Sequence, residues 1–482
     1  MNFLPMRSAS PLLSACLVLA AATFMLPVGA RRAGGEEPPV YAITNAKVVP
    51  VSAPTIERGT VVVRRGVIEA VGTDVAIPGD ARVIDATGLV VYPGLIDAFS
   101  ATGFGEDQAP APSRVRGTPP PAASREQPSQ LPEERQGVMP YRQAADLLNP
   151  AGKEIESARG AGITTVLAVP RGGIFTGQCS LVDLNGGAAG SMILKTPVAF
   201  SIDLSSRREY GGDYPSSPMG VFALVKQTLL DAQRYSTVWS IYNAHPGARR
   251  PEYNRALESL QPLVGRRLPA IIPADSPTEI QRVLELASTF RLSLIVAGGA
   301  ESGSIAPVLR ERNVPVLLSV KYPEPEKNAD PEAREELSAL RKRVKAPECA
   351  ALLAKAGIRF AFQSGGLANP KDFIRNVSRA VEAGLDREKA IRALTLDPAE
   401  IFGVADRVGS IEKNKTANLI LTTGDLFNAD THVKYAFVDG RKFDIVEPDP
   451  QRERDGEASG TPDLGSAGDR HKQQDAGGEQ PW

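Results

Sequence analysis

The chain has 482 residues, too many for one small domain, and 42% of them are hydrophobic, which is enough for a large buried core. Its formal net charge of -1 supplies no basic field, so we expect no nucleic-acid partner.

The N-terminal segment has the pattern of an export signal. Arg7 precedes an apolar run over residues 11–26, and small residues follow at 28–30. We therefore predict a signal peptide over residues 1–30, cleaved near Ala30, and a protein exported to the periplasm or the extracellular space. An uncleaved membrane anchor is the alternative, although the run is short for a membrane span.

Cleavage of that signal would leave Cys179 and Cys349 as the only cysteines. An oxidising compartment permits a disulfide between them, and separate burial as small apolar side chains is the other interpretation. The sequence leaves both open, and neither cysteine stands in a zinc-binding spacing.

Strand-like runs near both ends of the chain predict one composite β-sandwich. Short β-rich runs broken by glycine and Pro-Gly turns fill residues 40–92, and the same pattern returns over residues 405–447. Because such strands alone make a small sheet that needs a partner, we expect the two segments to pair around the region between them.

The stretch GLVVYPGLIDAFSATG, residues 88–103, opens that middle region. An apolar run enters the Pro93-Gly94 turn, and a second run ends in small, turn-prone residues. This is typical of a buried strand that opens into a loop at its C-terminal end, where α/β barrels carry their chemistry.

Seven further buried strands are predicted from apolar runs that alternate with helical segments. They are ITTVLAVP, CSLVDL, PVAFSIDL, LPAIIPA, RLSLIVAG, VPVLLSV and IRFAFQS. With the first strand they make eight, so we predict an α/β fold, a TIM-type (β/α)8 barrel over residues 93–404 inserted into the sandwich. The alternative is that CSLVDL is an excursion from the barrel.

Helix signals and low-complexity segments complete the organisation. Ser276, followed by proline and Glu279, predicts a capping box, and Asp397-Pro398 predicts a second helix start of the same kind. Gly384 and Gly403 stand where helices should end. A Pro-rich insertion is expected over residues 105–140 and a disordered tail over residues 448–482.

Two phrases carry a family resemblance. They are PGLIDA at residues 93–98 and RALTLDPAEIFGVADRVGSIEKNKTANLIL at residues 392–421. Both resemble the amidohydrolase superfamily, especially its exported imidazolonepropionase-like members. The resemblance implies a barrel that interrupts a sandwich, and hydrolysis of carbon–nitrogen bonds by a water that one or two divalent ions activate.

The same resemblance assigns five metal-ligand positions, and each holds a residue that cannot ligate through its side chain. The histidine pair of the first strand falls on Phe99 and Ala101, the histidines of the fifth and sixth strands on Pro273 and Gly298, and the aspartate of the eighth strand on Gly365. The whole chain has 3 histidines, and His245 is best interpreted as a cationic side chain at a helix end. We therefore predict no metal centre and no other cofactor.

Several polar residues are expected near the barrel mouth. Asp203 and Glu301 are candidates for an acid and a base that work without metal. Candidate pocket-lining residues are Gln178, Asp275, Gln363 and Ser364. A local role is the competing interpretation, with Asp203 and Asp275 capping loops or helices and Glu301 solvated.

These patterns favour an exported pseudoenzyme that binds a small molecule at the barrel mouth. It would act as a binding subunit, beside an active amidohydrolase relative or as a homo-oligomer. The alternative function is a hydrolase of carbon–nitrogen bonds, in non-peptide or cyclic amides, that uses an altered mechanism through Asp203 or Glu301. A structural envelope protein is a third interpretation, and fold analogy alone does not choose among them.

Overall fold

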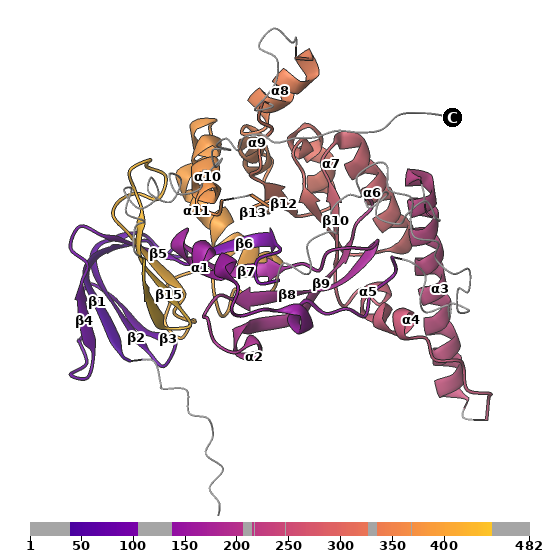
Figure 1. Ribbon diagram of the computed structural model, residues 1–482, viewed down its shortest axis with the longest axis horizontal. Coiled ribbons are helices and arrows are strands. Elements are labelled where there is room, and N and C mark those ends of the chain that lie inside the picture. The colour runs from indigo at the N-terminus through magenta and orange to yellow at the C-terminus, as the bar shows by residue number, and fades with distance from the viewer. Residues whose placement is uncertain are drawn as a thin grey trace, which may run out of the picture. The chain divides into compact units, whose positions relative to one another are not determined.

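Two eight-stranded β-sheets organise the chain in the computed structural model (Figure 1). The structure describes residues 39–104, 137–205, 215, 217–245, 247–325, 335–367 and 369–445. The predicted signal peptide and C-terminal tail, and most of the predicted Pro-rich insertion, lie outside these residues. Within the described residues, no helix has the length and apolar character needed to cross a membrane.

The first sheet, which we call the composite sheet, is built from two segments that lie far apart in the sequence. Its strands are β1 (Tyr41–Val48), β2 (Ile56–Arg64), β3 (Val67–Gly72), β4 (Arg82–Asp85), β5 (Val90–Pro93), β14 (Leu419–Thr422), β15 (Val433–Val438) and β16 (Arg441–Asp444). Strand β5 pairs in parallel with β1 and in antiparallel with β14. The early indigo strands therefore lie beside the late yellow ones, as Figure 1 shows.

The second sheet, which we call the βα sheet, holds the strands of the middle region. They are β6 (Leu95–Ser100), β7 (Ile163–Ala168), β8 (Phe175–Asp183), β9 (Ile193–Ile202), β10 (Ala270–Ala274), β11 (Leu294–Gly298), β12 (Val316–Ser319) and β13 (Phe360–Gln363), in that order across the sheet. Side chains from all eight strands enter one buried cluster, whose members include Ile96, Cys179, Ile271 and Leu317. The sheet thus curls around a shared interior.

The prediction of eight equivalent parallel strands is wrong at β8, which runs antiparallel to both of its neighbours. The connection from β7 to β8, residues 169–174, is too short for a crossover helix and turns at Gly172 and Gly173, whose φ angles are +79° and +92°. A parallel crossover needs a dozen or more residues, so this connection permits only an antiparallel pair. CSLVDL is therefore the excursion that the alternative interpretation described.

The βα sheet also does not close into a hydrogen-bonded barrel. Its edge strands β6 and β13 pack against each other, but no ladder joins them among the described residues. Instead, the Ser364 backbone N–H donates to Oδ1 of Asp97 at 2.9 Å. The α/β arrangement of the middle region is present, and the closed TIM barrel that we expected is not.

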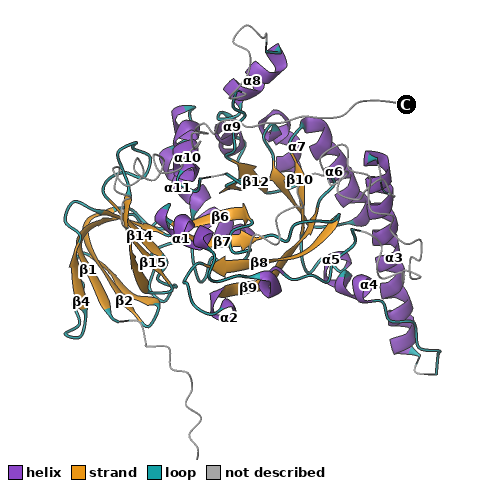
Figure 2. Cartoon of the chain, viewed as in Figure 1, coloured by secondary structure: helices purple, strands orange, loops and turns teal. Residues whose placement is uncertain are grey.

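Helices flank the outer side of the βα sheet (Figure 2). The α-helices are α1 (Lys153–Gly160), α2 (Ala189–Met192), α3 (Pro218–Ala244), α4 (Arg255–Ser259), α5 (Gln261–Val264), α6 (Pro277–Phe290), α7 (Ala306–Glu311), α8 (Leu337–Lys345), α9 (Cys349–Lys355), α10 (Asp372–Glu382), α11 (Arg387–Leu394) and α12 (Leu396–Ile401), with 3-10 turns η3 (Ala144–Leu147) and η4 (Ser302–Ile305). Alternate strand residues such as Ile272 and Val296 pack against this outer layer, which explains the near-continuous apolar runs.

Most of the predicted helix starts and ends agree with the structure. The capping box at Ser276 is confirmed, and Gly384 and Gly403 have positive φ after α10 and α12. The helix start expected at Asp397 is wrong, because α12 begins at Leu396. Asp397 lies inside the helix, where its carboxylate pairs with Arg392 at 2.6 Å.

Candidate functional site

The carboxyl ends of the parallel strands, which we call the mouth, are where ligands bind in folds of this kind. Phe99 lies in β6 and Ala101 just after it, Pro273 lies in β10, Gly298 ends β11, and Gly365 follows β13. All five positions assigned by resemblance therefore lie at or near the strand ends of this mouth.

At two of these positions a Cβ atom would meet the end of a neighbouring side chain. A Cβ atom at Gly298 would lie 2.4 Å from Asp275 Oδ1, and one at Gly365 would lie 2.3 Å from Ser319 Oγ. The φ angles of the two glycines, +88° and +63°, are also ones that L side chains rarely adopt. At these strand ends, side chains of neighbouring residues fill the space where a ligand side chain would begin.

The side chains at the mouth do not fit a divalent metal ion, which needs several nitrogen or oxygen donors that converge on one point. Across the described ranges, no group of three or more His, Cys, Asp or Glu side chains is arranged to hold one. His245 caps the end of α3, with Nδ1 3.0 Å from the Ile241 carbonyl oxygen, and His432 lies beside Thr423. The third histidine, His471, falls outside the described residues.

Asp203 and Glu301, the candidate acid and base, are each held by polar partners. Oδ1 of Asp203 accepts hydrogen bonds from the Ser205 backbone N–H at 2.8 Å and from Ser205 Oγ at 2.6 Å. Glu301 forms an ion pair with Lys342 of α8 at 3.0 Å. The loop-capping interpretation therefore describes Asp203 well, and Glu301 is a paired carboxylate.

Asp275 is a carboxylate at the mouth whose pKa is shifted by its surroundings. Burial raises the pKa of Asp275, although the Ala300 backbone N–H donates to its Oδ1 at 3.3 Å. The nearby charges of Glu279 and Glu301 raise this pKa further, and Lys342 opposes them. Asp275, Glu301 and Lys342 thus form a mixed-charge cluster beside the ends of β10 and β11.

The remaining predicted pocket residues act as anchors of the backbone. Gln178 Nε2 donates to the Pro140 carbonyl oxygen at 3.1 Å, which fixes the end of the predicted insertion. Gln363 is buried in β13, and its Oε1 accepts the Gly365 N–H at 2.8 Å. The backbone N–H of Ser364 is bound to Asp97.

Asp97 was missed as a functional residue, although it is the one charged side chain in the run LIDA. It is buried in β6, and Oδ1 accepts the backbone N–H groups of Phe99 at 3.3 Å and Ser364 at 2.9 Å. Burial raises the pKa of this carboxyl group. Asp97 is therefore a positioning residue that ties β6 to β13 at the mouth.

The two described cysteines are buried and not joined to each other. Cys179 lies in the interior of the βα sheet, and Cys349 Sγ accepts the Gly303 N–H at 3.3 Å. Burial raises the pKa of both thiols, which makes them poor nucleophiles and poor metal ligands.

Comparisons with known proteins agree with this fold. Residues 304–443 match the model of the Amidohydrolase family. An amidohydrolase from Thermotoga maritima MSB8 superposes with a TM-score of 0.70 at 24% identity, covering 84% of this chain and 100% of that one. A second amidohydrolase has a TM-score of 0.52 at 14% identity, with 85% and 100% covered.

A prolidase crystallised with N-methylphosphonate-L-proline has a TM-score of 0.51 at 15% identity, with 84% of this chain and 99% of that one covered. No curated protein matches the chain. At these sequence identities the solved structures support the fold alone. The family model supports a sequence similarity over the residues that it matches. The chain therefore has the fold of these amidohydrolases, and its residues 304–443 match the amidohydrolase family model.

Proposed function

We propose that this protein is an exported amidohydrolase-fold pseudoenzyme that binds a small molecule at the mouth without a metal centre. The observation that carries the proposal is the filled space at Gly298 and Gly365, where the carboxylate of Asp275 and the hydroxyl of Ser319 occupy the place of ligand side chains. Export rests on the signal-like pattern of residues 1–30.

The chemistry of the family explains why this observation matters. Metal-assisted hydrolysis depends on an ion that acidifies water and polarises the scissile group. Because ligands to such an ion act as a set, a chain without ligand side chains at all five positions assigned by resemblance would lack that set. The charged side chains at the mouth include the mixed-charge cluster of Asp275, Glu301 and Lys342.

This cluster favours a small polar ligand with both a cationic and an anionic group. An ammonium group would be attracted to Asp275 and Glu301, and a carboxylate to Lys342. As a binding subunit, the protein would act beside an active relative or as a homo-oligomer.

The competing function is hydrolysis of carbon–nitrogen bonds through Asp203 or Glu301, and one screen separates the two. Purified protein is incubated with dipeptides and cyclic amides, with and without chelator, alongside Asp203→Asn and Glu301→Gln. Glu57→Gln, which alters an exposed ion pair with Lys47 in the composite sheet, is the control. The pseudoenzyme shows no turnover above buffer under any condition. Turnover that survives chelation and is lost in either test variant alone would establish the hydrolase instead.

A further inference from the structure

A group of arginines lies at the end of the βα sheet opposite to the mouth. Arg266, Arg291, Arg312 and Arg359 stand in the short loops that lead into β10, β11, β12 and β13. These four strands are parallel neighbours, so the loops that precede them meet at one edge of the sheet. Neighbouring strands lie about 4.8 Å apart, which brings the four entry loops within the reach of long side chains.

All four arginines line one pocket of about 630 Å³. Its lining also includes the apolar side chains of Leu292, Ile295 and Val314. A volume of this size is within the range of pockets that hold small organic molecules, and an apolar floor with few charged groups is the usual composition of such sites.

The positive charge of this pocket is not neutralised by the described residues around it. Glu400 is the one carboxylate among the described lining residues, and it is already bound by Nη2 of Arg392 at 2.5 Å. No ion pair involves any of the four arginines within the described ranges.

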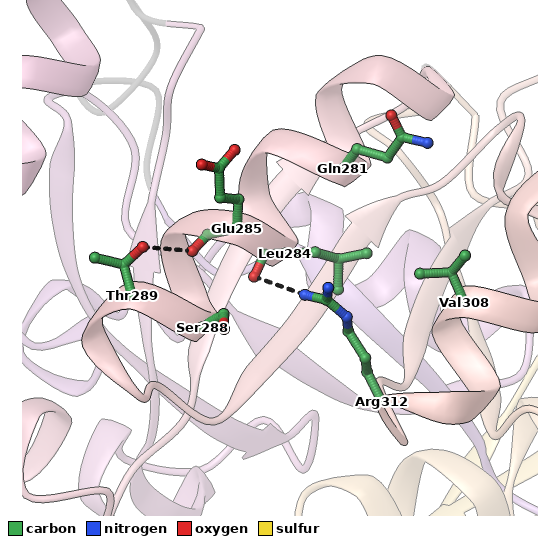
Figure 3. Close-up of a pocket in the computed structure, with 7 residues that line it drawn as sticks. All are labelled: Gln281, Leu284, Glu285, Ser288, Thr289, Val308 and Arg312. Atoms are coloured by element: carbon green, nitrogen blue, oxygen red, sulfur yellow. Dashed lines mark hydrogen bonds between the residues drawn. The ribbon is translucent and has the colours of Figure 1, made fainter.

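Arg312 also lines a neighbouring pocket, of about 470 Å³, on the surface of α6 and α7. Its Nη1 donates to the Leu284 carbonyl oxygen at 3.2 Å, and Figure 3 shows the carboxylate of Glu285 pointing away from it. This contact fixes the Arg312 side chain by a neutral acceptor and leaves its charge uncompensated.

Two of the arginines occupy backbone positions that suit glycine. Arg266 has a φ of 61° and Arg291 a φ of 55°, both in the left-handed region. At the corresponding turns into β7 and β13, the chain uses Gly162 and Gly357, with φ of 84° and 71°. An arginine at such a position costs stability relative to glycine, and this pocket carries two of them in adjacent loops.

We propose that this pocket binds a small anion that carries two or more phosphate or carboxylate groups. The planar guanidinium group donates paired hydrogen bonds to both kinds of oxyanion. Charges that repel one another in the empty pocket would be neutralised by such a ligand. Because the pocket lies at the amino ends of the strands, this site is separate from the mouth.

Isothermal titration calorimetry at a salt concentration of about 150 mM tests the proposal, with pyrophosphate and citrate as probes. The wild-type chain binds at least one of them with a Kd below about 1 mM. The double variant Arg266→Gly/Arg291→Gly binds at least about tenfold more weakly, because each arginine contributes charge-assisted hydrogen bonds. Its thermal midpoint is unchanged or higher, because glycine suits both backbone positions.

Arg65→Gly is the matched control, since Arg65 has a φ of 52° and lies in the composite sheet, and it leaves the affinity unchanged. Arg359→Gln provides a second test if the double variant does not fold. Binding of pyrophosphate alone assigns the site to phosphates, and binding of citrate alone assigns it to carboxylates. The proposal is overturned if neither probe saturates, if both the double variant and Arg359→Gln bind as tightly as the wild type, or if only an acidic polypeptide such as polyglutamate binds.

Discussion

A buried carboxylate at the junction of the two sheets makes a quantitative prediction about stability. Asp183 ends β8, and its Oδ1 accepts hydrogen bonds from Thr165 Oγ1 at 2.7 Å and from Asn418 Nδ2 at 2.9 Å. Asn418 in turn accepts the Asp439 N–H at 2.8 Å, in the turn between β15 and β16. The network therefore links β7 and β8 of the βα sheet to the composite sheet.

Burial raises the pKa of Asp183 from its ordinary value of 3.8 to about 6, against the lowering effect of its hydrogen bonds. The folded state thus holds the Asp183 proton more tightly than the unfolded chain does. The resulting stability is fully present below the unfolded pKa and is lost as the pH rises through the folded pKa. The difference between the folded and unfolded pKa of Asp183 corresponds to about 3 kcal/mol of stability, of which about 2 kcal/mol is lost between about pH 4.5 and about pH 8.

Replacing Asp183 by Asn tests this reasoning, because the amide oxygen can still accept both hydrogen bonds and carries no charge. Urea unfolding of the variant and the wild type is compared at about pH 4.5 and about pH 8. The variant gains about 2 kcal/mol relative to the wild type on going to the higher pH.

Asp85→Asn is the control, because hydrogen bonds, first from the Thr87 side chain, lower the pKa of the exposed Asp85 carboxyl group below its ordinary value of 3.8. The stability that this shift contributes is lost only as the pH falls below about 4, so the stability of Asp85→Asn relative to the wild type should be the same at about pH 4.5 and about pH 8. The reasoning is refuted if the free energy of unfolding of Asp183→Asn differs from that of the wild type by the same amount at both pH values.

Two further substitutions test the mouth. Asp97→Ala leaves two backbone N–H groups without their acceptor, so it should lower the free energy of unfolding in urea by about 2–4 kcal/mol. Asp97→Asn keeps an acceptor oxygen and should lower it clearly less. Equal losses in the two variants would show that Asp97 does not tie the edge strands together. Gly298→Ala should destabilise the protein by about 1–3 kcal/mol more than Gly172→Ala. Both glycines have positive φ, but a Cβ at Gly298 meets Asp275, whereas nothing lies within 4 Å of a Cβ at Gly172. Equal thermal midpoints for the two variants would contradict the filled space at Gly298.

The sequence predicted those elements whose signals are local. Apolar runs bounded by turns located the parallel strands from β9 to β13, because strands buried on both faces need continuous apolar sequence. The capping box at Ser276 was also predictable, since both of its partners lie within four residues. The Ser205 hydrogen bonds to Asp203 belong to the same short-range class.

Contacts between distant segments were not predictable in this way. Glu301 is paired with Lys342, and Ser364 is bound to Asp97, across separations that no local pattern encodes. The direction of β8 depended on the length of one loop, which the pattern of apolar residues does not report. At Asp397 the local cap signal was wrong, and the carboxylate pairs instead with Arg392 of the preceding helix.

Elemental analysis of the protein, purified without chelator from cells supplied with zinc, manganese and iron, is the most direct test of the missing metal centre. A filled mouth predicts well under one equivalent of these metals per chain after dialysis. It also predicts no change in thermal stability when they are added back. About one tightly held ion per chain, removed by chelator together with a loss of stability, would contradict the proposal.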